Sequence, residues 1–351
     1  MKSVVALALA LAATHAHAET TTGFGCNAVE FSTALPAIEG KDGVFFRTFT
    51  DLRMQHPLDD RTVHMLGQLA KVLKENGTTL VYVTIPSKSQ VMPQYLPAHA
   101  IDYGFVPQIA DEIYTDFITR LNNAGILAPD IMTALHANTG TEKSLFGDDF
   151  HWTSQGAKLG AQAIAAMIKA DPAYEDLPIK TFVTTPVGPE VAFSGMRRTL
   201  QSFCANSLPP TETMAYKTEA AAAATTDPAS TGLDIFASSA EILPVVLVGT
   251  SYSDSPINNF AGFLSEFTGL DVVNYAITGG NQFGAMTSYM TSDEFRQQRP
   301  RFLIWENPIY NNLAQYGAAP IEELIAAAGN TCTTKLPVTR VDERTISAAL
   351  D

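Results

Sequence analysis

The segment GTSYS (249–253) places a serine hydroxyl directly after the apolar run PVVLV (244–248). Ser251 could be a nucleophile at a strand end, but serine reacts poorly unless a base takes its proton and a third group orients that base. Alone, Gly-Thr-Ser is more typical of a turn, and position 253 is serine where the G-x-S-x-G pattern has glycine. A catalytic role for Ser251 therefore requires a base elsewhere in the chain.

His151 is the histidine best placed to be that base. Asp149 lies two residues before it, and side chains at i and i+2 of an extended segment point to the same side. The carboxylate could then fix the imidazole tautomer and stabilise the imidazolium. The alternative interpretation is a helix-capping aspartate beside a surface histidine. Because no second histidine stands at i+2 or i+4 from His151, a metal site is not predicted.

An acyl-transfer site also needs N–H donors near the developing oxyanion. The backbone N–H groups of Ser251 and Gly280 are candidates, together with the side-chain amide of Asn281 or Asn307. The residues do not decide between the two asparagines. By itself Gly280, in TGGN (278–281), is typical of an ordinary turn.

The elements that must position these groups follow an alternating pattern of helices and strands. A helix capped by Asp59 or Asp60 is predicted to run to Gly77, followed by a buried strand, TLVYVTI (79–85), and a helix over 106–125. GDDFHWTSQGAKLGAQAIAAMIKA (147–170) leads from a loop into a helix capped by Thr153 or Ser154. This alternation indicates α/β architecture with a parallel sheet.

The C-terminal third reads most regularly. Strands over 244–248, 271–277 and 300–305 alternate with helices over roughly 258–268 and 281–290. Right-handed crossovers would bring the loops GTSYS, TGGN and ENP (306–308) to one sheet edge, where ligands of open α/β sheets bind. Residues 172–240 look less regular, and TEAAAAATTDPASTG (218–232) is predicted to be a mobile surface loop.

The composition narrows the protein class and its compartment. MKSVVALALALAATHAHA (1–18) has the charge, apolar core and small-residue end of a cleaved secretory signal. With 46% hydrophobic residues the chain can bury a substantial core, and its net charge of −14 argues against nucleic acid or anionic membrane as a partner. Three cysteines in an oxidising compartment predict one disulfide and one remaining thiol, with the pairing open.

Several motifs together resemble one family. LVGTSYS, DFHWTSQG (149–156), KDG near the start, PSK (86–88) after the first buried strand and IWENP are similar to the alginate O-acetyltransferase group, the AlgX/AlgJ-like proteins with an SGNH-hydrolase-like domain. The resemblance covers about residues 26 to 332. It implies a three-layer α/β fold with a central, mainly parallel sheet. The catalytic motifs are permuted, since Asp and His precede the serine here and follow it in ordinary SGNH esterases.

The resemblance also implies a function and its residues. Ser251, His151 and Asp149 would form the triad that transfers acetyl to hydroxyls of an exported polysaccharide in the periplasm, without a cofactor. The acetyl donor would come from a membrane acyltransferase system, and the protein would be a monomer. A disulfide between Cys26 and Cys204 is implied as well. Further oxyanion or substrate candidates are Tyr252, Lys88 and Arg198.

The chain departs from the family pattern at its ends. Only about forty residues follow IWENP, so we expect one domain over 19–351, with the less regular insertion around 172–240 and without a C-terminal carbohydrate-binding module. Two alternative functions remain: an acetylesterase that uses the same triad, and a non-catalytic polysaccharide-binding or export-scaffold protein.

Overall fold

The computed structural model describes residues 22–54, 56, 58–221, 243–329, 338–340, 342 and 346–348. The predicted leader, residues 1–18, and Cys332 lie outside these ranges. Within them, no helix is long and apolar enough to cross a bilayer. The same residues contain no group of three or more His, Cys, Asp or Glu side chains arranged to hold a metal ion.

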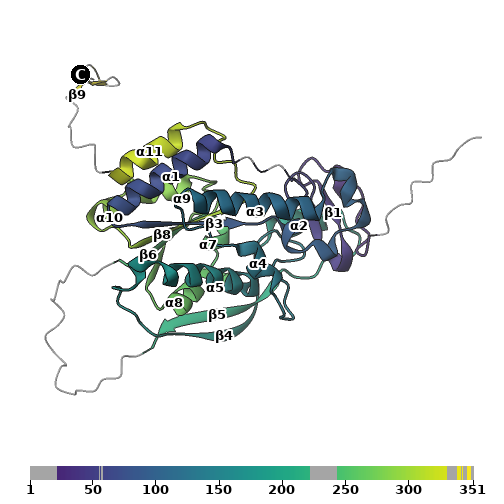
Figure 1. The fold of residues 1–351 in the computed structure, drawn as a ribbon. Helices are drawn as coiled ribbons and strands as arrows, with labels where there is room; N and C mark the ends of the chain where they lie inside the picture. Colours follow the sequence, from purple (N-terminus) through teal and green to yellow (C-terminus); the bar gives the residue numbers. More distant parts are fainter. Residues whose placement is uncertain are drawn as a thin grey trace, which may run out of the picture.

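A four-stranded parallel sheet lies at the centre of the molecule (Figure 1). Its strand order is β3 (Thr79–Ile85), β8 (Phe302–Pro308), β6 (Val245–Val248), β7 (Val272–Asn274). Every residue of β3, β6 and β8 is buried, as expected of parallel strands covered on both faces. The predicted α/β fold with a parallel sheet is confirmed.

Two strand boundaries differ from the prediction because of the pairing partners. β7 ends at Asn274, opposite Leu247, since β6 has only one residue left beyond that pair. β8 continues through residues 306–308, because β3 still pairs with it up to Ile85↔Pro308. The ENP segment is therefore the end of a strand and not a loop.

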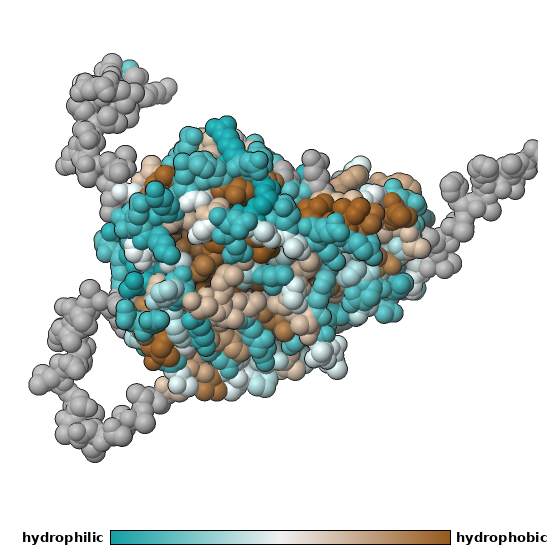
Figure 2. All heavy atoms as spheres, in the orientation of Figure 1, coloured by the Kyte–Doolittle hydropathy of each residue, from teal (hydrophilic) through white to brown (hydrophobic). Residues whose placement is uncertain are grey.

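Helices cover both faces of the sheet (Figure 1). On one face lie α1 (Asp60–Glu75), α3 (Pro107–Asn123), α9 (Gly284–Met290) and α11 (Ala319–Gly329); on the other lie α5 (Ser154–Ala170) and α8 (Phe260–Thr268). Alternate β3 residues serve the two cores: Leu80 packs with the first group and Val81 with the second. On the face in Figure 2 hydrophilic and hydrophobic side chains are mixed, and hydrophobic ones gather near β1 (Ala37–Glu39) and the adjoining end of α3.

Helix starts follow local capping chemistry. Asp59 accepts a hydrogen bond from the Thr62 N–H and so begins α1, while Thr153 accepts from Gly156 and begins α5. Shorter elements include β1 (Ala37–Glu39), β2 (Phe45–Arg47), α2 (Lys88–Val91), α4 (Ile131–His136), α6 (Gly195–Gln201), α7 (Ser251–Asp254), α10 (Asp293–Gln297), β9 (Val338–Arg340) and β10 (Ile346–Ala348).

The prediction of a less regular segment over 172–240 is wrong for much of its described part. β4 (Phe182–Val191) and β5 (Glu212–Ala220) form a long antiparallel pair beside α8 (Figure 1). Tyr216 of β5 packs against Phe263 of α8. Prolines within β4 and its largely exposed side chains hide the alternation typical of a strand. Of the predicted loop over 218–232, the first residues belong to β5, and 222–232 lies outside the described residues.

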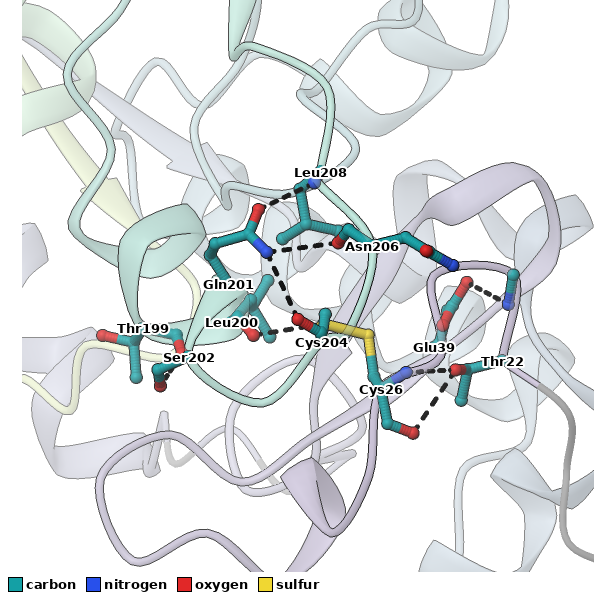
Figure 3. The surroundings of a disulfide bond; sticks show 11 residues. Thr22, Cys26, Glu39, Thr199, Leu200, Gln201, Ser202, Cys204, Asn206 and Leu208 are labelled. Carbon is teal, nitrogen blue, oxygen red and sulfur yellow. Dashed lines mark hydrogen bonds between the residues drawn. A yellow bond between two sulfur atoms is a disulfide. The ribbon is translucent and has the colours of Figure 1, made fainter.

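A disulfide joins Cys26 to Cys204, 178 residues apart in sequence. Figure 3 shows it between the N-terminal segment, with Thr22 and Glu39, and the segment that follows α6. The backbones at the two cysteines also pair with each other. A small core that includes Phe45 and Leu200 lies close by. The bond therefore ties the N-terminal segment to the segment between β4 and β5.

Removing this bond should lower stability. We expect the Cys26→Ser/Cys204→Ser variant to lose about 2–5 kcal/mol of unfolding free energy, because a cross-link over so long a loop restricts the unfolded chain. Denaturant unfolding with and without dithiothreitol would measure the loss. The reductant should destabilise the wild type and leave the variant unchanged; an equal shift in both would contradict the expectation.

Candidate active site

Ser251 is the first residue of α7, directly after β6 and the turn formed by Gly249 and Thr250. Thr250 caps the helix and accepts a hydrogen bond from the Tyr252 N–H. As the first helical residue, Ser251 has no intrahelical acceptor for its N–H, and none of its contacts among the described residues supplies another. A hydroxyl and a free N–H thus lie at the C-terminal end of a central strand.

His151 and Asp149 come from the loop before α5. Asp149 Oδ1 accepts hydrogen bonds from His151 Nδ1 at 2.6 Å and from the His151 backbone N–H at 2.8 Å. A carboxylate can only accept, so Nδ1 carries the proton and Nε2 is left as an acceptor. His151 Nε2 lies 2.7 Å from Ser251 Oγ. The structure therefore brings together the three residues that the sequence singled out.

Two side chains hold the Asp149 segment in place. Ser194, the residue before α6, donates from Oγ to Asp149 Oδ2 at 2.6 Å. Burial would raise the pKa of Asp149, but hydrogen bonds and charge from His151, with the bond from Ser194, hold that pKa well below its ordinary value. Sequence reasoning missed Ser194; its only sequence signal is a serine at a helix start, and nothing in the chain links it to residue 149.

Lys88 was predicted to be a substrate candidate, and its position contradicts this. Only 1% of it is exposed, and Nζ donates to the backbone oxygens of Gly147 at 2.6 Å and Asp149 at 2.9 Å. Burial lowers its pKa to about 8. Ser87 caps α2 two residues after the end of β3, and the next side chain, Lys88, lies inside the molecule. Through these two hydrogen bonds Lys88 supports the loop that carries Asp149.

Tyr252 also has a packing role and not the predicted oxyanion or substrate contact. It is 2% exposed, and its hydroxyl donates to the backbone oxygen of Phe150 at 2.7 Å. Trp152 donates from its indole to the backbone oxygen of Tyr252 at 2.8 Å. The rings of Phe150 and Tyr252 lie 4.1 and 4.8 Å from the His151 ring, centre to centre. These aromatic contacts hold the imidazole against the turn that carries Ser251.

The structure supports some of the predicted oxyanion donors and not others. The Gly280 N–H already donates to the Ile277 oxygen in a turn. The Asn307 side chain is 1% exposed and bonds to the Gln282 oxygen and to Asn311, because position 307 lies inside β8. The structure therefore supports neither Gly280 nor Asn307 as an oxyanion donor. Asn281 is exposed, with a φ of 52°, and with the Ser251 N–H it remains a candidate.

Comparison with known proteins identifies the family. A family model described as an SGNH hydrolase-like domain, acetyltransferase AlgX, matches residues 37–309. The chain belongs to this family. The resemblance inferred from GTSYS and DFHWTSQG is thereby confirmed.

Relatives and solved structures agree with this assignment. AlgX of Pseudomonas aeruginosa, an alginate biosynthesis protein, is 33% identical over 278 residues, 79% of this chain and 56% of AlgX. The probable alginate O-acetylase AlgJ of the same organism is 30% identical over 83% of this chain and 75% of AlgJ. The AlgX structure superposes with a TM-score of 0.73 at 30% identity and covers 86% of this chain and 68% of its own. The chain thus spans little more than half the length of AlgX.

In this AlgX-family chain a buried carboxylate contacts the turn that carries Ser251. Glu306 of β8 is 0% exposed and accepts hydrogen bonds from the Thr250 N–H at 2.8 Å, the Thr250 hydroxyl at 3.1 Å and the Ser253 hydroxyl at 2.9 Å. A Cβ on Gly249 would lie 2.5 Å from its Oε2, so only glycine fits there. Sequence reasoning placed Glu306 in a loop and missed this contact.

Glu306 should make stability depend on pH. Burial raises its pKa from 4.5 to about 7, against the hydrogen bonds from Thr250 and Ser253. Between pH 4.5 and about pH 7 the folded chain holds a proton on Glu306 that the unfolded chain has lost. The contribution of Glu306 to the free energy of unfolding therefore falls as pH rises through this range and is constant above about pH 7. As pH rises from 4 to 8, we expect the free energy of unfolding of Glu306→Gln to increase by about 3 kcal/mol relative to that of the wild type.

Denaturant unfolding of the wild type and of Glu306→Gln at several pH values measures this difference. The other titratable groups are the same in both proteins, so their contributions cancel in the comparison. Glu190→Gln, on the exposed part of β4, is the matched control and should give a curve parallel to the wild type. A Glu306→Gln curve parallel to the wild type as well would contradict the expectation.

Arg198 is exposed, as a substrate contact requires. Its guanidinium lies over the Phe193 ring, 5.0 Å from the ring centre. The neighbouring Arg197 forms an ion pair with Asp148 at 3.3 Å. The structure thus separates two adjacent arginines, one bound to the protein and one facing solvent.

Proposed function

We propose that this protein is a polysaccharide O-acetyltransferase that carries acetyl as an ester of Ser251. The observation that carries the proposal is the hydrogen-bonded line from Ser251 Oγ through His151 to Asp149, with distances of 2.7 and 2.6 Å. Membership of the AlgX acetyltransferase family supports the reaction class. Relatives named for alginate biosynthesis and alginate O-acetylation support a polysaccharide acceptor.

Acylation would begin as Ser251 Oγ attacks the carbonyl carbon of the acetyl donor. His151 Nε2 takes the hydroxyl proton, and Asp149 stabilises the imidazolium that forms. The Ser251 N–H faces the developing oxyanion, with the Asn281 amide as a second candidate donor. Collapse of the tetrahedral intermediate breaks the bond to the donor's leaving group, which receives the proton from His151. The acetyl group is then an ester on Ser251.

Deacylation would repeat these steps in reverse with a sugar hydroxyl. His151 takes the proton of that hydroxyl while its oxygen attacks the serine ester. The second tetrahedral intermediate releases Ser251, which regains the proton from the imidazolium. The acetyl group leaves on the sugar. If water takes the place of the sugar, the same residues act as an acetylesterase.

Labelled acetyl decides between these reactions. The protein is incubated with an acetyl-labelled ester donor and an oligosaccharide acceptor, and the products are separated. Label on the sugar supports the transferase, whereas free acetate alone supports the esterase. If neither forms, and a fluorophosphonate labels wild type and Ser251→Ala equally, the protein is a non-catalytic binding or scaffold protein.

We propose further that the protein works as a monomer in the periplasm and receives acetyl from a membrane acyltransferase system. The disulfide between Cys26 and Cys204 supports an oxidising compartment. Fractionation of cells tests the compartment, and the mass in solution tests the oligomeric state. Loss of glycan acetylation when the membrane acyltransferase is removed would support the donor route.

A further inference from the structure

A solvent-facing aromatic ring lies one residue from the contact that supports the acid of the triad. Phe193 is 81% exposed, and the Arg198 guanidinium lies 5.0 Å from its ring centre. The next residue, Ser194, donates to Asp149 Oδ2 at 2.6 Å. Asp149 contacts His151, which in turn contacts Ser251. The residue next to this ring in sequence thus supports Asp149, which contacts the proposed base, His151.

The backbone that carries the ring is fixed to the protein at Ser194 and at Arg197. Ser194 accepts a hydrogen bond from the Arg197 N–H at 2.9 Å and so caps α6. Arg197 also forms the ion pair with Asp148, and its guanidinium donates to the backbone oxygens of Leu208 and Pro209. Phe193 and Arg198 therefore project from an anchored segment, which is what a binding site needs to hold its contacts in place.

The charge of Arg198 is available to a ligand. The protein has a net charge of −14, yet within residues 22–221 and 243–329 no carboxylate pairs with Arg198. Its guanidinium covers one face of the Phe193 ring, and the exposure of the ring leaves the other face to solvent. A planar guanidinium binds a carboxylate through two parallel hydrogen bonds, and an aromatic face offers a flat apolar surface.

We propose that Phe193 and Arg198 form an acceptor subsite for an acidic sugar of the polysaccharide. The free ring face stacks on the apolar face of the pyranose, and the guanidinium binds its carboxylate. The subsite rests on the proposed acetyl transfer, and it would hold a polymer residue near the one whose hydroxyl reaches Ser251.

The test compares Phe193→Ala and Arg198→Gln with Phe31→Ala, a matched control at an equally exposed phenylalanine. In acetyl transfer to an oligouronate, we expect each subsite variant to raise the acceptor KM about tenfold or more, as loss of a charge-assisted contact does. Hydrolysis of a small acetyl ester, which needs only the triad, should stay within about twofold. With a neutral oligosaccharide, Arg198→Gln should behave as wild type. An unchanged oligouronate KM in both variants, or an equal rise in Phe31→Ala, overturns the proposal.

Direct binding separates this proposal from the proposed function. Calorimetry with the oligouronate on Ser251→Ala, with and without Phe193→Ala or Arg198→Gln, measures affinity without turnover. Weaker binding in both double variants supports the subsite even if the wild type transfers no acetyl. Equal binding in all of them overturns the subsite even if transfer is observed.

Discussion

Replacing Ser251 with alanine is expected to lower acetyl transfer by a factor of about 10⁴–10⁶, because no other group can form the acyl ester. Its Oγ lies 2.7 Å from His151 Nε2, the atom that would receive its proton. His151→Ala should cost a similar factor, and the double variant should cost little more, since the two residues act as one unit. Rates with a labelled acetyl donor and mass spectrometry of the acetyl-enzyme measure these effects.

Ser255→Ala is the matched control for this loss. Ser255 follows α7 and is partly exposed, and its side chain makes no hydrogen bond among the described contacts. Its activity and acetyl-enzyme signal should match the wild type. An acetyl adduct on Ser251→Ala, or transfer within about tenfold of wild type, would show that the nucleophile is a different residue.

Asp149→Asn is the second substitution with a large expected effect, about 10³–10⁴ in kcat. If the new amide NH₂ faces His151 Nδ1, the proton moves to Nε2, which can then no longer accept from Ser251. If the amide oxygen faces Nδ1, the tautomer is kept, but the negative charge that stabilises the imidazolium is lost. Both orientations lower the rate of the same step, so KM should change far less than kcat.

Ser194→Ala is the comparison for Asp149→Asn, because Ser194 donates a hydrogen bond to the Asp149 carboxylate. It removes the hydrogen bond from Ser194 to Asp149 Oδ2 and keeps the carboxylate, so we expect a loss of only about tenfold. Burst kinetics with a chromogenic acetyl ester would measure acylation for both variants. An Asp149→Asn enzyme no slower than Ser194→Ala would mean that the charge on residue 149 is not needed.

The sequence by itself determined the parts of this protein that depend on local order. Helix α5 follows from apolar spacing, with a cap at Thr153 or Ser154 that the structure assigns to Thr153. The apolar run of β3 indicated a strand buried on both faces. The contact of Asp149 with His151 is also local, because a spacing of two residues lets the carboxylate reach both the ring and the backbone N–H of residue 151.

Only the tertiary structure decided which distant groups meet. Ser251 and His151 are 100 residues apart, and their contact depends on strand order and on the packing of Trp152 against the nucleophile turn. Lys88 was predicted to be an oxyanion or substrate residue and Glu306 to lie in a loop, yet both are buried. A sequence gives the charge of a side chain but not its depth, because depth depends on which strand pairs beside it and which helix covers it. Local chemistry therefore indicated the candidate nucleophile, base and acid, and long-range packing determined which groups hold them in place.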